Sequence, residues 1–176
     1  SSYSETAAYV ETKTNCAEYQ DGTWVKNVTK TYLSNAWRLK TLYYKVDCLK
    51  DGDYAFTALA ATNSTRKATI KFATDADNYT KVVSATLLDT ATESGNTYNG
   101  YKETVAEGVL RLKKGINIIK VTFADTAPNI DYFTIYKKDA DSYYQLKDVV
   151  KGTITLDQFV QQMNTDELAT FFVSYA

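Results

Sequence analysis

The chain has 176 residues, which is enough for one domain of ordinary size with its own hydrophobic core. Its 20 basic and 21 acidic residues leave a formal net charge of −1 and are spread along the chain, so neither nucleic acid nor an anionic membrane surface is an expected partner. The lack of histidine excludes His-dependent catalytic triads and His-ligated metal sites, and the 15 tyrosines supply many amphipathic rings. An uncharged polar ligand is therefore expected.

Residues 1–14, SSYSETAAYVETKT, are expected to form an N-terminal linker or extension. The segment lacks the charged and apolar regions of a signal peptide. No apolar run elsewhere approaches the ~20 residues that a membrane helix requires, so no membrane partner is expected.

The region from about Tyr44 to Tyr136 has the pattern of an all-β sandwich, with short strands separated by turn signals. In YKVDC (44–48) and YAFTALA (54–60), apolar side chains alternate, and the intervening LKDGD turn predicts that the two strands form a hairpin. The same period of two predicts strands in ATIKF (68–72), GVLRL (108–112) and INIIKVTF (116–123).

The pattern changes at Ser142. In TLDQFVQQMNTDELATFF (155–172), Leu156, Phe159, Val160 and Met163 recur at helical spacing, and Thr155 is a candidate N-cap. A second helix start is predicted at NTDEL (164–168). A short C-terminal helical tail is therefore expected after the sandwich, with too little apolar surface to be a separate domain.

The two cysteines, Cys16 and Cys48, are too few for a disulfide scaffold or a four-thiolate zinc site. Each lies in a strand-like context. A disulfide between them and two buried free thiols are both compatible with this pattern.

Four stretches occur in a characteristic order: AEYQ (17–20), YYKVDCLKDGDYAFTALAAT (43–62), GNTYNGYKETV (95–105) leading to LRLKKGINIIKVTF (110–123), and APNIDYFTIY (127–136). With these landmarks, the segment from about Asn15 to Lys138 resembles the family 6 and family 35 carbohydrate-binding modules. The resemblance implies a galactose-binding-like jelly-roll sandwich over residues 15–140. It also implies a polysaccharide or oligosaccharide partner, for which a plant cell-wall β-glucan or xylan is expected.

The stretch VKGTITLDQFVQQMNTDELATFF (150–172) is similar to the opening of family 3 glycoside hydrolase barrel domains, a match that covers about Gln145 to Ala176. It implies that residues 141–176 are a linker and the first helices of a β-glucosidase-like catalytic domain of the same polypeptide. That family's catalytic carboxylates lie further downstream, so this chain is expected to be non-catalytic. The parent is expected to be secreted or on the cell surface, or intracellular if it acts on imported oligosaccharides.

Three function classes follow from these patterns. A glycosidase needs two opposed carboxylates roughly 5 to 9.5 Å apart, and no acidic pair here stands in a recognisable constellation. Pairs such as Asp75 and Asp77 are typical of turns. A carbohydrate binder needs aromatic rings and a few fixed polar groups, which the sequence can provide. A structural spacer or dimerisation module without sugar binding is the alternative.

The resemblance also implies a sugar site in the loops at one end of the sandwich. Asn129 matches an Asn near the last strand of those modules, and Tyr98 and Tyr101 fall at the positions of two loop aromatics. Trp37 is the candidate for the aromatic of an early loop, with Tyr32 behind it. Trp24 is a third candidate for this early position, and a core role for Trp37 is equally compatible with the sequence.

The last implied feature is a structural calcium ion between the first and last strands, with Glu18 and Asp131 as its acidic ligands. Alternation in NIDYF places Ile130 and Tyr132 on one face and Asp131 with Phe133 on the other, so the carboxylate is expected beside an apolar layer. Cys16 stands where those families often have a second acidic residue, and a thiol is a poor calcium ligand. Exposed edge positions for Glu18 and Asp131 are the alternative.

Overall fold

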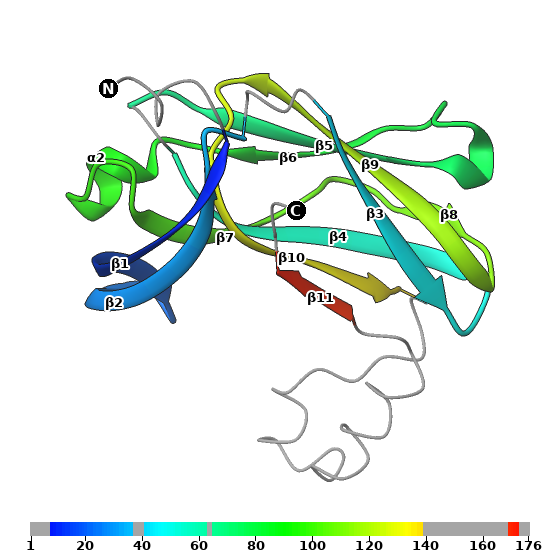
Figure 1. Ribbon diagram of the computed structural model, residues 1–176, viewed down its shortest axis with the longest axis horizontal. Coiled ribbons are helices and arrows are strands. Elements are labelled where there is room, and N and C mark those ends of the chain that lie inside the picture. The colour runs from blue at the N-terminus through cyan, green and yellow to red at the C-terminus, as the bar shows by residue number, and fades with distance from the viewer. Residues whose placement is uncertain (1–7, 37–40, 63–64, 139–168, 173–176) are drawn as a thin grey trace, which may run out of the picture.

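The computed structural model describes residues 8–36, 41–62, 65–138 and 169–172, which fold into two β-sheets packed face to face (Figure 1). In the described part, one sheet has seven strands in the order β11-β10-β2-β1-β7-β4-β8, and the other has four in the order β3-β9-β5-β6. The all-β jelly-roll sandwich expected from the sequence is confirmed. The strands are β1 (Tyr9–Gln20), β2 (Thr23–Ser34), β3 (Thr41–Cys48), β4 (Gly52–Ala61), β5 (Ala68–Thr74), β6 (Val83–Leu87), β7 (Gly100–Val105), β8 (Leu110–Leu112), β9 (Gly115–Asp125), β10 (Asn129–Lys137) and β11 (Ala169–Phe172).

Among the residues that the structure describes, two short helical turns lie between strands. They are η2 (Asp75–Asp77), between β5 and β6, and α2 (Thr90–Ser94), between β6 and β7. Within the described ranges, no helix is long and apolar enough to cross a membrane. The strand β1 begins at Tyr9, inside the segment expected to be a linker or extension.

The predicted hairpin between residues 44–48 and 54–60 is wrong. Strand β3 pairs with β9 in the four-stranded sheet, whereas β4 pairs with β7, β8 and β10 in the other sheet. The turn after Cys48 therefore carries the chain across the sandwich. Val46 and Phe56 still face the same core, because β3 and β4 cover it from opposite sheets. Apolar alternation is the same for two strands of a hairpin and for two strands in facing sheets, so it does not distinguish these arrangements.

The main core lies between the two sheets and contains the residues that alternation had assigned to the inner faces. Phe56 and Phe72 have ring centroids 5.1 Å apart, and Phe72 and Phe133 have theirs 5.5 Å apart. A second, smaller cluster lies on the other face of β4. Its buried members are Cys16, Tyr32, Leu59, Ala61 and Tyr101. Burial on both faces explains the nearly continuous apolar run of β4.

Both cysteines are buried free thiols in the structure. Cys48 belongs to the main core and Cys16 to the second cluster, so the two side chains lie on opposite sides of a sheet. Of the two possibilities left open by the sequence, the structure has the free thiols.

A bulge at Asp131 changes the facing of β10. Between β10 and β4 the register advances by two residues on β10, from Ile130 to Tyr132, and by one on β4, so Asp131 is the extra residue. As a result, Ile130 and Phe133 both enter the main core, while Tyr132 packs against the second cluster. The predicted sharing of one face by Ile130 and Tyr132 is therefore wrong.

The C-terminal residues 169–172 form strand β11, antiparallel to β10, and not the helix predicted from the NTDEL start. One edge of β10 pairs with β4, and on its other edge only Ile130 pairs with β2, so the rest of that edge is available to another strand. Thr170 and Phe171 are residue types that favour strands. The remaining helix positions, including Leu156, Phe159, Val160 and Met163, lie outside the described residues.

Candidate functional site

Tyr98 and Asn129, two residues of the predicted sugar site, are brought together at the end of the sandwich. Tyr98 lies in the loop between α2 and β7 with φ of 74°, and it is 52% exposed. Asn129 begins β10, is only 4% exposed, and donates from Nδ2 to the carbonyl oxygen of Tyr98 at 2.7 Å. The amide of Asn129 therefore fixes the backbone of the Tyr98 loop.

Tyr32 and Tyr101, predicted to contact the sugar, are in the second core cluster. They are 2% and 0% exposed, with ring centroids 5.7 Å apart. The Tyr32 hydroxyl donates to Glu11 Oε2 at 2.7 Å, and burial raises the pKa of both phenols. Stacking of a sugar on either ring is ruled out in this structure, because both rings are already covered by protein.

The two tryptophan candidates have different outcomes. Trp37 lies outside the described residues. Trp24, on β2, is half-buried and packs edge-to-face against Tyr19 with centroids 5.3 Å apart. The Tyr19 ring also contacts Lys102, whose Nζ lies 4.4 Å from the ring centroid. This aromatic pair is part of the β1–β2 hairpin and does not face the Tyr98 loop in any described contact.

A different surface gathers exposed aromatic and polar groups on the outer face of the four-stranded sheet. We call it the β5–β9 groove. It is a pocket of about 440 Å³. Its lining residues are Lys71, Phe72, Ala73, Tyr79, Val82, Ser84, Lys120 and Thr122.

Strand register sets the floor of this groove in two rows. In one row Lys120 and Ala73 are cross-strand neighbours on β9 and β5, and Tyr43 on β3 continues this row beyond the lining of the groove. In the other row Thr122, Lys71 and Ser84 are neighbours on β9, β5 and β6. These residues point away from the core because they alternate with buried residues of the same strands.

The loop after β5 holds Tyr79 over this floor. Asn78 and Tyr79 both have left-handed backbone conformations, with φ of 58° and 60°, which is uncommon for a bulky side chain. The Tyr79 amide donates to the carbonyl oxygen of Thr74 at 2.8 Å, and Asp75 Oδ1 accepts from the amide of Ile118 on β9 at 2.9 Å. The tyrosine is thus presented by a loop tied to both neighbouring strands.

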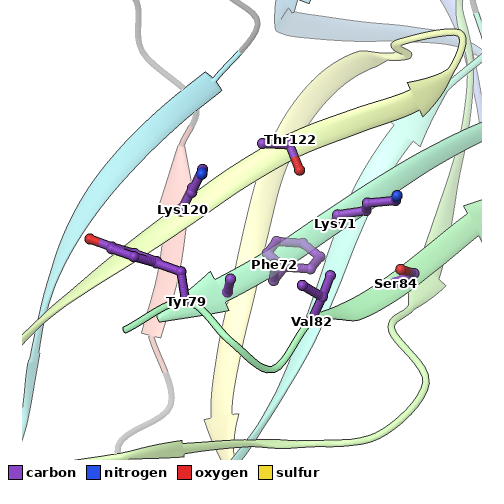
Figure 2. Close-up of a pocket in the computed structure, with 8 residues that line it drawn as sticks. Lys71, Phe72, Tyr79, Val82, Ser84, Lys120 and Thr122 are labelled. Atoms are coloured by element: carbon purple, nitrogen blue, oxygen red, sulfur yellow. The ribbon is translucent and has the colours of Figure 1, made fainter. Parts of the chain in front are cut away.

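The side chains around Tyr79 form a mixed aromatic and cationic surface. Its ring meets that of Tyr43, which is 60% exposed, edge-to-face at a centroid distance of 6.5 Å. Lys120 Nζ lies 5.6 Å from the Tyr79 centroid. Figure 2 shows Tyr79 and Lys120 at one end of the groove and Lys71 with Ser84 toward the other.

The polar groups of the groove are available to a ligand. Among the described residues, neither Lys71 nor Lys120 takes part in an ion pair. Local desolvation and the nearby Asp75 carboxylate raise the pKa of Tyr79, so its hydroxyl stays protonated at neutral pH. Sequence reasoning missed this groove because its residues occupy outward positions of strands, which alternation assigns to solvent. The sequence signal for this groove is the turn DNYT (77–80) together with the outward-facing Lys71, Lys120 and Tyr43 of the neighbouring strands.

The predicted metal ligands Glu18 and Asp131 are also brought together, but by a lysine. Lys30 Nζ, from β2, donates to Glu18 Oε1 and to Asp131 Oδ2, the latter at 3.1 Å. The three side chains are 12%, 14% and 10% exposed for Lys30, Glu18 and Asp131. The alternative of two exposed edge carboxylates is therefore wrong.

This arrangement does not fit a calcium ion. Calcium takes six to eight oxygen ligands, whereas both carboxylates here are bonded to one ammonium group. The Cys16 thiol points to the carbonyl oxygen of Lys13, at 3.6 Å. Within the described ranges, no cluster of three or more His, Cys, Asp or Glu side chains is placed to hold a metal.

Among known proteins, similarity was found to solved structures of carbohydrate-binding modules. No family model matches the chain, and no curated protein matches its sequence. The fold is similar to the family 35 carbohydrate-binding module from Clostridium thermocellum, with 17% identity, a TM-score of 0.47, and coverage of 75% of this chain and 98% of that one. It is also similar to a β-1,3-glucan-binding CBM6 from Bacillus halodurans, with 12% identity, a TM-score of 0.42, and coverage of 72% and 86%. At these identities and TM-scores, function has to be argued from the residues of this chain.

Proposed function

We propose that this chain is a non-catalytic module that binds a polysaccharide or oligosaccharide in the β5–β9 groove. The observation that carries the proposal is the presentation of Tyr79, held in a left-handed conformation over a polar groove and beside exposed Tyr43. Unusual backbone of this kind persists where the surrounding structure enforces it, and it concentrates at binding sites.

The chemistry of the groove suits a sugar. The C–H face of a pyranose ring packs on an aromatic face, while its hydroxyl groups need a few fixed donors and acceptors. Tyr79 and Tyr43 supply the aromatic faces, and Lys71, Lys120 and Ser84 supply the polar partners. Because the site is open to water, the expected Kd is weak, roughly 10 μM to 1 mM.

The ligand class and the parent are the finer parts of the proposal. The ligand is a plant cell-wall β-glucan or xylan, in keeping with the sequence resemblance to family 6 and family 35 modules. The parent is a family 3 glycoside hydrolase whose catalytic domain follows, and its support is the similarity of residues 145–176 to the opening of such barrels. The module would then hold the enzyme near its polymeric substrate.

Affinity gel electrophoresis tests the proposal on a panel of β-glucans and xylans. We expect one polysaccharide to retard the wild type, and Tyr79→Ala or Tyr43→Ala to weaken the retardation about tenfold or more, as expected for a lost aromatic contact. Tyr98→Ala is the matched control, since Tyr98 is also an exposed tyrosine with positive φ.

The opposite pattern would place the site elsewhere. Loss of binding in Tyr98→Ala with retention in Tyr79→Ala would favour the loop site predicted from the sequence, formed by Tyr98 and Asn129. Lack of retardation of the wild type on every polymer would favour an interdomain spacer.

A further inference from the structure

A buried ion network links three strands of the large sheet. Glu18 comes from β1, Lys30 from β2 and Asp131 from β10. The side chain of Gln20 donates to the remaining oxygen of Glu18, and the Lys30 ammonium lies 6.0 Å from the centroid of the buried Tyr101 ring. The network thus lies on the second core cluster, where the β1–β2 hairpin meets β10, a strand far from both in sequence.

The backbone is irregular next to two of these side chains. Asp131 is the bulged residue of β10, and the β1–β2 register shifts between Lys13 and Cys16 and again between Cys16 and Glu18. Bulges of this kind re-aim side chains and recur where a special arrangement is needed. Because Asp131 follows the core residue Ile130, it lies on the opposite face of β10, the face that Tyr132 also takes after the bulge.

Two carboxylates at this depth require a cation. Each buried ion costs several kcal/mol unless it is paired and hydrogen-bonded. Burial lowers the pKa of the Lys30 ammonium, but its hydrogen bonds to Glu18 and Asp131 outweigh burial and raise that pKa. Lys30 is therefore charged at neutral pH and neutralises one of its two partners.

We infer that Lys30 is the resident cation of this site and joins β1, β2 and β10 in place of a metal ion. The ammonium occupies the position between the two carboxylates that a divalent ion would need. A calcium ion would have to displace a covalently attached cation from both of its partners. The fold of this chain therefore does not depend on calcium.

Thermal unfolding of the full chain tests this inference. The wild type should melt at the same temperature in 5 mM calcium chloride and in EDTA, because only an ion bound by the folded state raises Tm. Lys30→Met keeps the apolar stem and removes the charge, so its Tm should fall by roughly 10 °C. Lys30→Arg retains a positive charge at this position, so its Tm should fall by only a small part of the decrease expected for Lys30→Met.

A charge-neutral triple variant separates the ion network from packing. Glu18→Gln, Lys30→Met and Asp131→Asn together remove all three charges, so this variant should recover most of the Tm lost by Lys30→Met alone. The triple variant also keeps the test valid if Lys30→Met does not fold, because it contains no uncompensated charge.

Two results would overturn the inference. One is a calcium-dependent rise in the Tm of the wild type that Asp131→Asn abolishes. The other is an equal loss of Tm in Lys30→Met and in the triple variant, which would assign Lys30 a packing role only.

Discussion

Replacement of Asn129 by alanine should destabilise the fold, because this amide holds the backbone of a loop. The side chain is 4% exposed, and its Nδ2 donates to the Tyr98 carbonyl at 2.7 Å. Loss of one partner of such a bond costs about 1–3 kcal/mol. For a chain of this size each kcal/mol lowers Tm by about 2–4 °C, so the expected decrease is about 2–12 °C.

Asn96 provides a matched control for this prediction. Its Nδ2 also donates to a backbone carbonyl at 2.7 Å, that of Asn15, but the bond is exposed to solvent. Water can replace the lost amide there, so Asn96→Ala should change stability by no more than about 0.5 kcal/mol. Asn129→Asp should be more damaging than Asn129→Ala, because the carboxylate also has no N–H to donate and would place a buried negative charge against the carbonyl oxygen of Tyr98.

The assay is urea unfolding followed by circular dichroism, together with affinity electrophoresis of each variant. Equal destabilisation by Asn129→Ala and Asn96→Ala would refute the argument from burial. Full stability of Asn129→Ala combined with loss of polysaccharide binding would show that Asn129 contacts the ligand, as the sequence had predicted.

Three further predictions concern stability and activity. Gly100→Ala should cost about 1–3 kcal/mol in urea unfolding, because its Cβ would clash with Ser94 Oγ and lie 3.0 Å from the Thr90 carbonyl oxygen. A variant as stable as the wild type would contradict this packing. Burial raises the pKa of Glu18, but hydrogen bonds from Lys30 and Gln20 outweigh it and lower that pKa below 4.5. The Glu18 carboxylate therefore stabilises the fold above pH 4.5, and this contribution is lost as the pH falls through the lower pKa that Glu18 has in the folded state. The difference in unfolding free energy between the wild type and Glu18→Gln should accordingly disappear at low pH. A difference that does not change with pH would refute this. The purified chain should release no product from aryl glycosides, and turnover that survives repurification and depends on one carboxylate would show that the chain is an enzyme.

The sequence predicted the faces of strands well, because apolar alternation reports directly which side chains enter a core. Val46, Phe56, Ile70 and Leu110 all lie where alternation placed them. Alternation carries no information about which strand is the partner, so the crossing of the chain after Cys48 was mistaken for a hairpin.

The candidate sugar site and the contacts of Glu18 and Asp131 were less predictable from the sequence than the strand faces. Tyrosine is equally suited to a core and to a sugar surface, so Tyr32 and Tyr101 could be distinguished from Tyr79 only by the packing around them. Asp131 and Glu18 were predicted to share a calcium ion, whereas the structure shows them sharing Lys30, which lies 101 residues from Asp131 in the sequence. Neither local pattern nor composition reveals such a contact.

The groove itself is tested most directly by an NMR titration of the 15N-labelled wild type with an oligosaccharide of the polymer that retards it. We expect the largest amide shift changes in three segments, residues 71–73, 78–84 and 120–122, which form the floor and the Tyr79 wall of the groove. Shift changes confined to residues 96–101 and 127–129 would contradict it, because they would place the sugar on the Tyr98 loop at the end of the sandwich.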